Sequence, residues 1–212
     1  MGSIWQYVLT FIIFIVFATF HEYGHGWMAY RKGDSTAKLS GRLSLNPITH
    51  IDLMWTIILP AMLLISSGGR FAFGSAKPVP VNPYRLRDPK RDMVWVGLAG
   101  PATNIIWSLL IILLMKSGLF DPGSRLYLNG ALYLFLFMCL QMNVVLLVFN
   151  MLPIPPLDGS RIVEGLLPDE YADKYASIRP YGFMILIALM FLGVLGRLLH
   201  LVIYLVIRIF AL

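Results

Sequence analysis

The chain has 212 residues, of which 58% are hydrophobic and only 13% charged. Soluble domains are about 45–50% apolar and about 25% charged, so this composition excludes a soluble globular protein and favours one that is solvated by lipid. The net charge of +6 could suggest nucleic-acid binding. The basic residues cluster between apolar segments, however, as in the cytoplasmic loops of membrane proteins, and no nucleic-acid partner is expected. The single cysteine, Cys139, excludes a disulfide framework and a cysteine-rich zinc module.

Four apolar segments are long enough to cross a bilayer, which requires about 20 residues. Their expected bounds are 4–30, 94–115, 129–152 and 181–200. The first leads directly into ionisable residues and is not expected to be a cleaved signal peptide. The chain is therefore predicted to be a single all-α, multi-pass membrane domain, a helical bundle of about four spans over residues 1–212. Whether 181–211 is one tilted helix or a span followed by a surface helix stays open.

Residues 53–67 form a shorter apolar run with Pro60 in its middle. At this length a re-entrant segment competes with a true span. The prolines that follow, Pro78, Pro80 and Pro83, exclude a helix and predict a small extended element, an edge-like β-hairpin, over residues 71–83. Val79 keeps its backbone N–H between two prolines, which makes it a candidate for pairing with an extended substrate strand. The alternative is that the segment only seals the site.

The first apolar segment ends in the sequence His21-Glu22-Tyr23-Gly24-His25, an H-E-x-x-H motif. On a helix, residues four apart share a face, so both imidazoles can bind one metal ion while Glu22 lies beside it and can activate a water. The alternative is two histidines hydrogen-bonded within a helix bundle, with Glu22 as their partner. Ionisable groups at membrane depth are costly and functional by default, which favours the metal site.

A catalytic zinc ion needs a third protein ligand. Extended zincin motifs place a histidine six residues after the second one, where this chain has Arg31, and no glutamate occurs between Glu22 and Glu164. The acidic residues that remain near membrane depth are Asp52 and Asp158. Asp158 lies before Gly159, and for such a residue a helix cap or turn is an equal alternative.

Three motifs together resemble the site-2 protease family of intramembrane zinc metalloproteases. They are the H-E-x-x-H at His21–His25, G-x-A-G-P-x-x-N from Gly97 to Asn104, and N-x-x-P-x-P-x-L-D-G from Asn150 to Gly159. The resemblance covers residues 18–165. It implies one Zn²⁺ per chain on His21, His25 and Asp158, with Glu22 as the catalytic acid/base and a membrane protein as the substrate. No PDZ-like or nucleotide-sensing domain is visible, so the chain resembles a minimal member.

Other polar residues have two interpretations each. Asn104 and Asn150 are candidates for hydrogen bonding to substrate or for bridging helices. His50 and Asp52 are candidates for supporting the metal ligands or for simple capping. The polar stripe formed by Arg197, His200, Tyr204 and Arg208 favours an interfacial helix over a catalytic role.

The two halves of a shared metal site must lie at one depth of the bilayer. If 53–67 crossed completely, Asp158 would emerge on the face opposite to His25. If it re-enters and returns to the same side, 94–115 crosses the bilayer outward and 129–152 crosses back. Asp158 then lies at the same depth as His21 and His25. Re-entry also places ten basic residues from Arg31 to Arg91, with Arg161, on the cytoplasmic side. The expected location is a bacterial or archaeal plasma membrane, with the site toward the cytoplasm.

Two other classes of function fit parts of this pattern. A metal transporter should show paired ionisable residues along the whole depth of the bilayer, and often a repeat, whereas this chain has one cluster at one depth. A catalytically silent scaffold descended from a protease would be free to lose Glu22, which is present.

Overall fold

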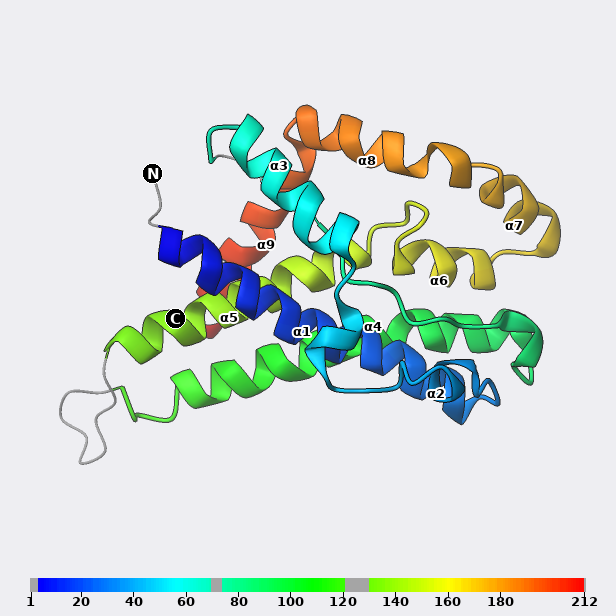
Figure 1. Cartoon of the computed structure of the whole chain (residues 1–212), viewed down its shortest axis with the longest axis horizontal. Coiled ribbons are helices and arrows are strands. Elements are labelled where there is room, and N and C mark those ends of the chain that lie inside the picture. Colours follow the sequence, from blue (N-terminus) through cyan, green and yellow to red (C-terminus); the bar gives the residue numbers. More distant parts are fainter. Residues whose placement is uncertain (1–3, 70–73, 121–129, 212) are drawn as a thin grey trace.

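A computed structural model describes residues 4–69, 74–120 and 130–211 of the chain. All regular structure in these residues is helical (Figure 1). The long helices are α1 (Ile4–Arg31), α4 (Pro89–Met115) and α5 (Gly130–Asn150). The shorter ones are α2 (Thr36–Leu39), α3 (Leu59–Ser66), α6 (Asp158–Leu166), α7 (Asp169–Ala176), α8 (Gly182–Phe191) and α9 (Val194–Phe210). Brief helical turns occupy Pro47–His50, Leu53–Ile58, Pro83–Arg85 and Arg179–Tyr181.

The helices α1, α4 and α5 are each long and apolar enough to cross a membrane. They alternate in direction: Phe17 packs against Trp107 late in α4, while His25, further along α1, contacts Val96 near the start of α4. The expected all-α bundle is confirmed for the described residues. A fourth span exists there only if the bent run from α7 to α9 is counted as one.

These three helices enclose one apolar core. It consists of Ile13, Phe17, Ile111, Ile112, Met115, Leu136, Cys139, Leu140 and Val144. The outer faces are also apolar, and large side chains such as Ile12, Leu113 and Leu134 are exposed. A helix that is hydrophobic all round is suited to surroundings of protein on one side and lipid on the other.

The C-terminal segment is broken into two helices, so 181–200 is not one continuous span. The chain direction changes by 71° between the run Asp169–Phe191 and α9. The break lies at Gly193, whose φ of 69° is in the left-handed region that favours glycine. In the polar stripe of α9, Tyr204 is exposed, whereas Val202, Ile203 and Val206 on the same helix pack on the core.

The short apolar segment Leu53–Ser66 runs toward the beginning of α1, and the chain then returns toward the metal-ligand end of α1. Near its far end, the Tyr7 hydroxyl donates to the carbonyl of Gly69 (3.1 Å), so α3 ends beside the beginning of α1. On the return, Ser75 N–H donates to the carbonyl of Trp55 (3.1 Å) and Lys77 N–H to that of His50 (2.8 Å). The excursion therefore begins and ends beside the same part of the bundle (Figure 1).

The predicted β-hairpin is wrong for the described residues. Residues 74–82 are extended but pair with no strand, and 70–73 lie outside the described residues. Pro78 and Pro80 cannot donate to a ladder. Four of the other N–H groups reach single acceptors on separate elements: the carbonyls of Trp55 and His50 and the carboxylates of Glu22 and Asp34. The segment is thus held as an extended strap.

Asp34 fixes the end of this strap. It is fully buried, and it accepts the N–H of Asn82 (2.6 Å) and the N–H of Thr36 (2.9 Å). Burial alone would raise the pKa of the Asp34 carboxyl, but the hydrogen bonds from Thr36 and Asn82 more than offset it and hold this pKa below its usual range. The carboxylate therefore stays ionised at neutral pH and ties the strap to the loop after α1.

Candidate metal centre

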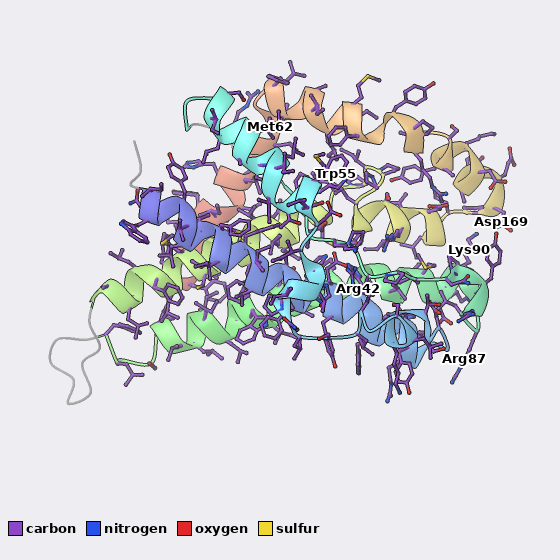
Figure 2. The ribbon with its side chains drawn as sticks, in the orientation of Figure 1. Arg42, Trp55, Met62, Arg87, Lys90 and Asp169 are labelled. Carbon is purple, nitrogen blue, oxygen red and sulfur yellow. The ribbon has the colours of Figure 1, made fainter. Side chains whose placement is uncertain are left out.

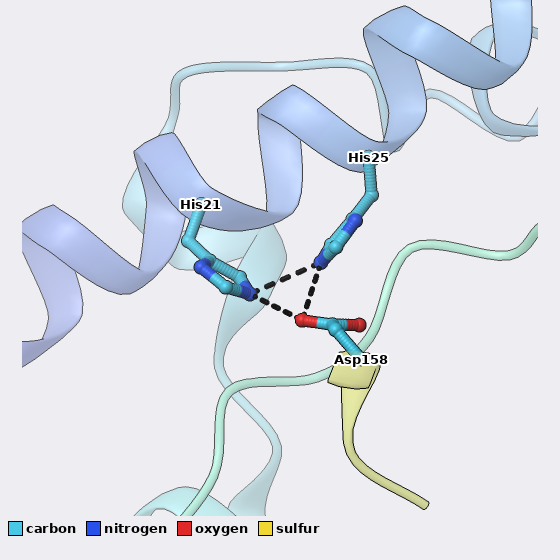
Figure 3. A group of neighbouring side chains, drawn as sticks. All are labelled: His21, His25 and Asp158. Atoms are coloured by element: carbon cyan, nitrogen blue, oxygen red, sulfur yellow. Dashed lines mark hydrogen bonds and ion pairs between the residues drawn. The ribbon is translucent and has the colours of Figure 1, made fainter. Parts of the chain in front are cut away.

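Two imidazoles from α1 and one carboxylate from α6 meet inside the bundle (Figure 3). His21 Nε2 and His25 Nε2 lie 3.0 Å apart, and Asp158 Oδ2 lies 3.0 Å from the first and 3.1 Å from the second. All three side chains are buried. Residues distant in the sequence thus direct three potential ligand atoms at one point.

The other nitrogen of each imidazole is already occupied, which sets the tautomer. His25 Nδ1 contacts the carbonyl oxygen of Val96 at 2.6 Å; because a carbonyl only accepts, this nitrogen carries the proton. His21 Nδ1 lies 2.7 Å from Asn104 Oδ1. A neutral histidine protonated on Nδ1 has a lone pair on Nε2, the atom that faces Asp158 in both residues.

A relay through α5 fixes the orientation of Asn104. Asn143 Nδ2 donates to the carbonyl of Cys139 (2.9 Å), which turns Asn143 Oδ1 toward Asn104 Nδ2 (3.0 Å). Asn104 Oδ1 is therefore left as the acceptor for His21 Nδ1–H. Both asparagines are fully buried, so each hydrogen bond replaces one that water would have made.

This donor set fits a zinc ion. With both Nδ1 atoms protonated, two nitrogen lone pairs and a carboxylate oxygen converge with no hydrogen between them, and a cation at their centre would remove the repulsion. Tetrahedral zinc with bonds of about 2.0–2.1 Å requires ligand atoms roughly 3.3 Å apart. The distances of 3.0–3.1 Å lie close to that spacing.

Glycines let the helices approach closely enough to form the site. A Cβ on Gly100 of α4 would lie 2.3 Å from His25 Nε2 and 2.7 Å from His21 Nε2, so only hydrogen fits there. A Cβ on Gly24 of α1 would lie 2.7 Å from the carbonyl oxygen of Ala99. Small residues of this kind allow helix backbones to pack closely in membranes.

Asp158 reaches the site because the chain turns back sharply after α5. It is the first residue of α6, and a Cβ on the next residue, Gly159, would lie 2.3 Å from the carbonyl oxygen of Met151. The second carboxylate oxygen of Asp158 lies 3.6 Å from Arg161 Nη1. Arg161 thus occupies the side of the carboxylate that faces away from the histidines.

Glu22 lies in the same cavity, and the strap contacts it. Val79 N–H donates to Glu22 Oε2 at 2.8 Å. The Val79 amide, which the sequence leaves free for a substrate strand, is therefore already used. The cavity has a volume of about 150 Å³ and lies between α1, the strap, the end of α5 and the start of α6.

The other predicted residues divide into two groups. Asn150 lines the cavity and donates its side-chain N–H to the Leu146 carbonyl (3.0 Å). His50 is buried away from it, with Nε2 2.8 Å from the carbonyl oxygen of Ser44. Asp52 caps the helical turn that begins at Leu53. The positions of His50 and Asp52 do not bring them to the ligand cluster among the described residues.

Sequence reasoning missed Asn143 and Gly100. Asn143 is a fully buried amide inside an otherwise apolar helix. A polar side chain in a membrane segment needs a hydrogen-bond partner on a neighbouring helix, and this was the signal that could have found it. Gly100 lies within the G-x-A-G-P-x-x-N motif, but only the distance to the imidazoles shows what it does.

Comparison with known proteins decides the class of this site. The model of peptidase family M50 matches residues 9–122 and 118–193. The chain belongs to peptidase family M50. This is the site-2 protease family, whose members are zinc metalloproteases, and with its long apolar helices this M50 chain is an integral membrane protein.

The relatives that match the chain are named as zinc metalloproteases. The chain is 39% identical to "Putative zinc metalloprotease YwhC" of Bacillus subtilis over 84% of its own length and 78% of that protein. It is 30% identical to "Putative zinc metalloprotease Rip2" of Mycolicibacterium smegmatis over 84% of its length and 64% of the relative. "Zinc metalloprotease MJ0392" of Methanocaldococcus jannaschii is 28% identical over 80% of this chain and 37% of the relative. No solved structure gives a significant match.

The asparagine relay predicts a specific loss of metal affinity. Asn104→Ala removes the acceptor of His21 Nδ1–H, so this imidazole is free to rotate or to change tautomer. We expect zinc affinity to fall about 10–100-fold, the usual cost of removing a group that orients a metal ligand. Competition with a chromogenic chelator measures it. Asn150→Ala, whose amide bonds only within α5 among the described residues, is the matched control and should keep wild-type affinity. Equal affinities in the two variants would show that the relay does not orient His21.

Proposed function

We propose that this M50 chain is an intramembrane zinc endopeptidase that cleaves transmembrane or membrane-proximal segments of other membrane proteins. The observation that carries the proposal is the convergence of the His21, His25 and Asp158 donor atoms, buried among apolar helices, in a cavity that also contains Glu22. Family membership supports the metalloprotease class. The intramembrane substrate follows from the placement of the cavity among helices suited to lipid.

The residues divide the chemical work. His21 Nε2, His25 Nε2 and Asp158 Oδ2 would hold one Zn²⁺, which when bound polarises a scissile carbonyl and lowers the pKa of water. Glu22 is the general base that takes the proton from the attacking water and then the acid that gives it to the leaving amine. The N–H of Val79 holds one carboxylate oxygen of Glu22 and leaves the other to carry the proton.

The size of the cavity restricts the form of the substrate. An α-helix is about 10–12 Å across with its side chains, and a volume of about 150 Å³ does not admit it. A helical backbone also keeps its carbonyls hydrogen-bonded. The cleaved segment must therefore be unwound and extended when it reaches Glu22.

We infer a topology in which 53–67 re-enters. Leu53–Ser66 is 14 residues long, about 21 Å as a helix, against a hydrocarbon thickness of about 30 Å. The strap returns to His50 and Glu22. Three spans then place the end of α1 and the start of α6 at one depth, with the basic loop residues on the cytoplasmic side of the plasma membrane.

Thiol labelling in intact cells tests this topology. Cys139 is buried, so single cysteines introduced elsewhere can be read separately. We expect Lys38→Cys and Lys90→Cys to be shielded from a membrane-impermeant reagent until the cells are opened, and Ser117→Cys to react from outside. Labelling of Lys77→Cys from outside would mean that 53–67 crosses the bilayer, and the re-entrant arrangement would be wrong.

Metal content and activity together test the assignment of roles. The wild type should bind about one zinc per chain. His21→Ala and Asp158→Ala should lose it because each removes a ligand. Glu22→Gln should keep the zinc and lose cleavage of a tagged membrane substrate, because an amide cannot accept the proton. If Asp158→Asn kept both zinc and activity, Asp158 would not be the third ligand. Zinc binding without cleavage by the wild type would favour the silent scaffold.

The variant Val79→Pro tests the contact between Val79 and Glu22. Proline removes the N–H that holds the Glu22 carboxylate, so we expect kcat to fall by about tenfold or more for a transmembrane substrate and a short soluble peptide alike, with zinc content unchanged. Val79→Ala keeps the N–H and is the matched control, with near wild-type rates. Steady-state rates on both substrates provide the measurement. A loss confined to the transmembrane substrate would instead indicate that the strap helps to unwind the substrate.

A further inference from the structure

A second, larger cavity adjoins the metal cavity. Its volume is about 680 Å³, and its walls come from the end of the strap, the first turns of α4, and α6 and α7. Val79, Pro156 and Arg161 line both cavities, so the two adjoin at these residues. We call the larger cavity the α6–α7 groove. Its volume is within the range of about 300–1,000 Å³ that is usual for ligand sites.

The lining of the groove is suited to a peptide. Apolar side chains, among them Val81, Pro83 and Met93, line part of it, and charged side chains of both signs line the rest. The cations are Lys90, Arg161 and Arg179, and the anions are Glu164, Asp169 and Asp173. This balance disfavours a phosphate-rich ligand, which needs an excess of cations. It also disfavours lipid tails, which would cover these charged side chains without giving them a polar partner.

The outer wall of the groove is weakly attached. No residue of α7 is buried. In the described structure α7 and the turn after it are held by the ion pairs Lys90–Asp169 and Glu164–Arg179 and by Tyr175 O–H, which donates to the Pro153 carbonyl (2.8 Å). Figure 2 shows Lys90 and Asp169 meeting at one end of the molecule. Exposed ion pairs contribute little to stability, so moving α7 to admit a chain costs little.

We propose that the α6–α7 groove is the second part of the substrate site and binds, in extended form, the cytoplasmic flank of the polypeptide that is cleaved at the metal cavity. The inference rests on the proposed function. An extended chain advances about 3.3 Å per residue, so a substrate that lies across Glu22 must leave the small cavity within a few residues. The groove is the space that adjoins the small cavity at Val79, Pro156 and Arg161, so a chain that passes these side chains enters it.

Blocking the groove without touching the metal site tests the proposal. Ala172 lines the groove on α7, whereas Ala176, one turn later on the same helix, does not. We expect Ala172→Trp to raise KM about tenfold for a substrate with its natural cytoplasmic flank. The same variant should cleave a substrate trimmed to one or two flank residues at the wild-type rate. Ala176→Trp should match the wild type on both substrates, and zinc content should be equal in all three proteins.

Two outcomes would overturn the proposal. One is an equal KM of Ala172→Trp and wild type for the long substrate; the other is an equal loss on both substrates. Cleavage of neither substrate by the wild type would instead contradict the proposed function.

Cross-linking gives a readout that does not depend on turnover. In the Glu22→Gln protein treated with an added thiol oxidant, Ala172→Cys should form a disulfide with cysteines at a short window of positions in the substrate flank, and Ala176→Cys should not. The native Cys139 is buried and does not compete. Equal cross-linking of the two variants, or none in either, would show that the flank does not occupy the groove.

Discussion

The structure depends on holding three lone pairs together inside the helix bundle. His21 Nε2, His25 Nε2 and Asp158 Oδ2 lie within 3.0–3.1 Å of one another, and the Nδ1 hydrogen bonds keep the histidine lone pairs directed inward. This requires α1 and α4 to approach at Gly24 and Gly100, and the chain after α5 to turn back at Gly159. The packing of the bundle is therefore set by the metal site as much as by its apolar core.

The asparagine relay shows how polar groups can be buried in the interior of a membrane protein without losing their hydrogen bonds. Asn143 and Asn104 are fully buried, and each donates to one neighbour and accepts from another, from the Cys139 carbonyl to the His21 ring. Every side-chain nitrogen and oxygen of the two asparagines has a hydrogen-bond partner, so their burial costs less than that of unpaired amides. The same bonds couple α5 to the metal ligand, which links helix packing to ligand geometry.

The strap and α7 form the other half of the site and are held in different ways. The strap is extended, and its prolines cannot donate to a strand ladder. Four of its other N–H groups bond to separate elements, one of them to the Glu22 carboxylate. In contrast to the long helices, α7 has no buried residue. If the proposed substrate site is correct, ligands on the long helices and substrate contacts on α7 would keep the metal site fixed while a polypeptide enters.

The sequence by itself determined the membrane class, the long helices, the H-E-x-x-H face and, through a family resemblance, Asp158 as a ligand candidate. These follow from local hydrophobicity and helical periodicity, which need no knowledge of distant contacts. Tertiary structure alone decided that 71–83 forms no hairpin in its described part, that the C-terminal segment bends at Gly193, and that His50 and Asp52 serve the loop rather than the ligand cluster. It also decided that Val79 N–H binds Glu22 and that Asn143 lies behind Asn104. Each of these depends on which acceptor lies nearest in space, and residues 39 or 57 positions apart carry no local signal of that proximity.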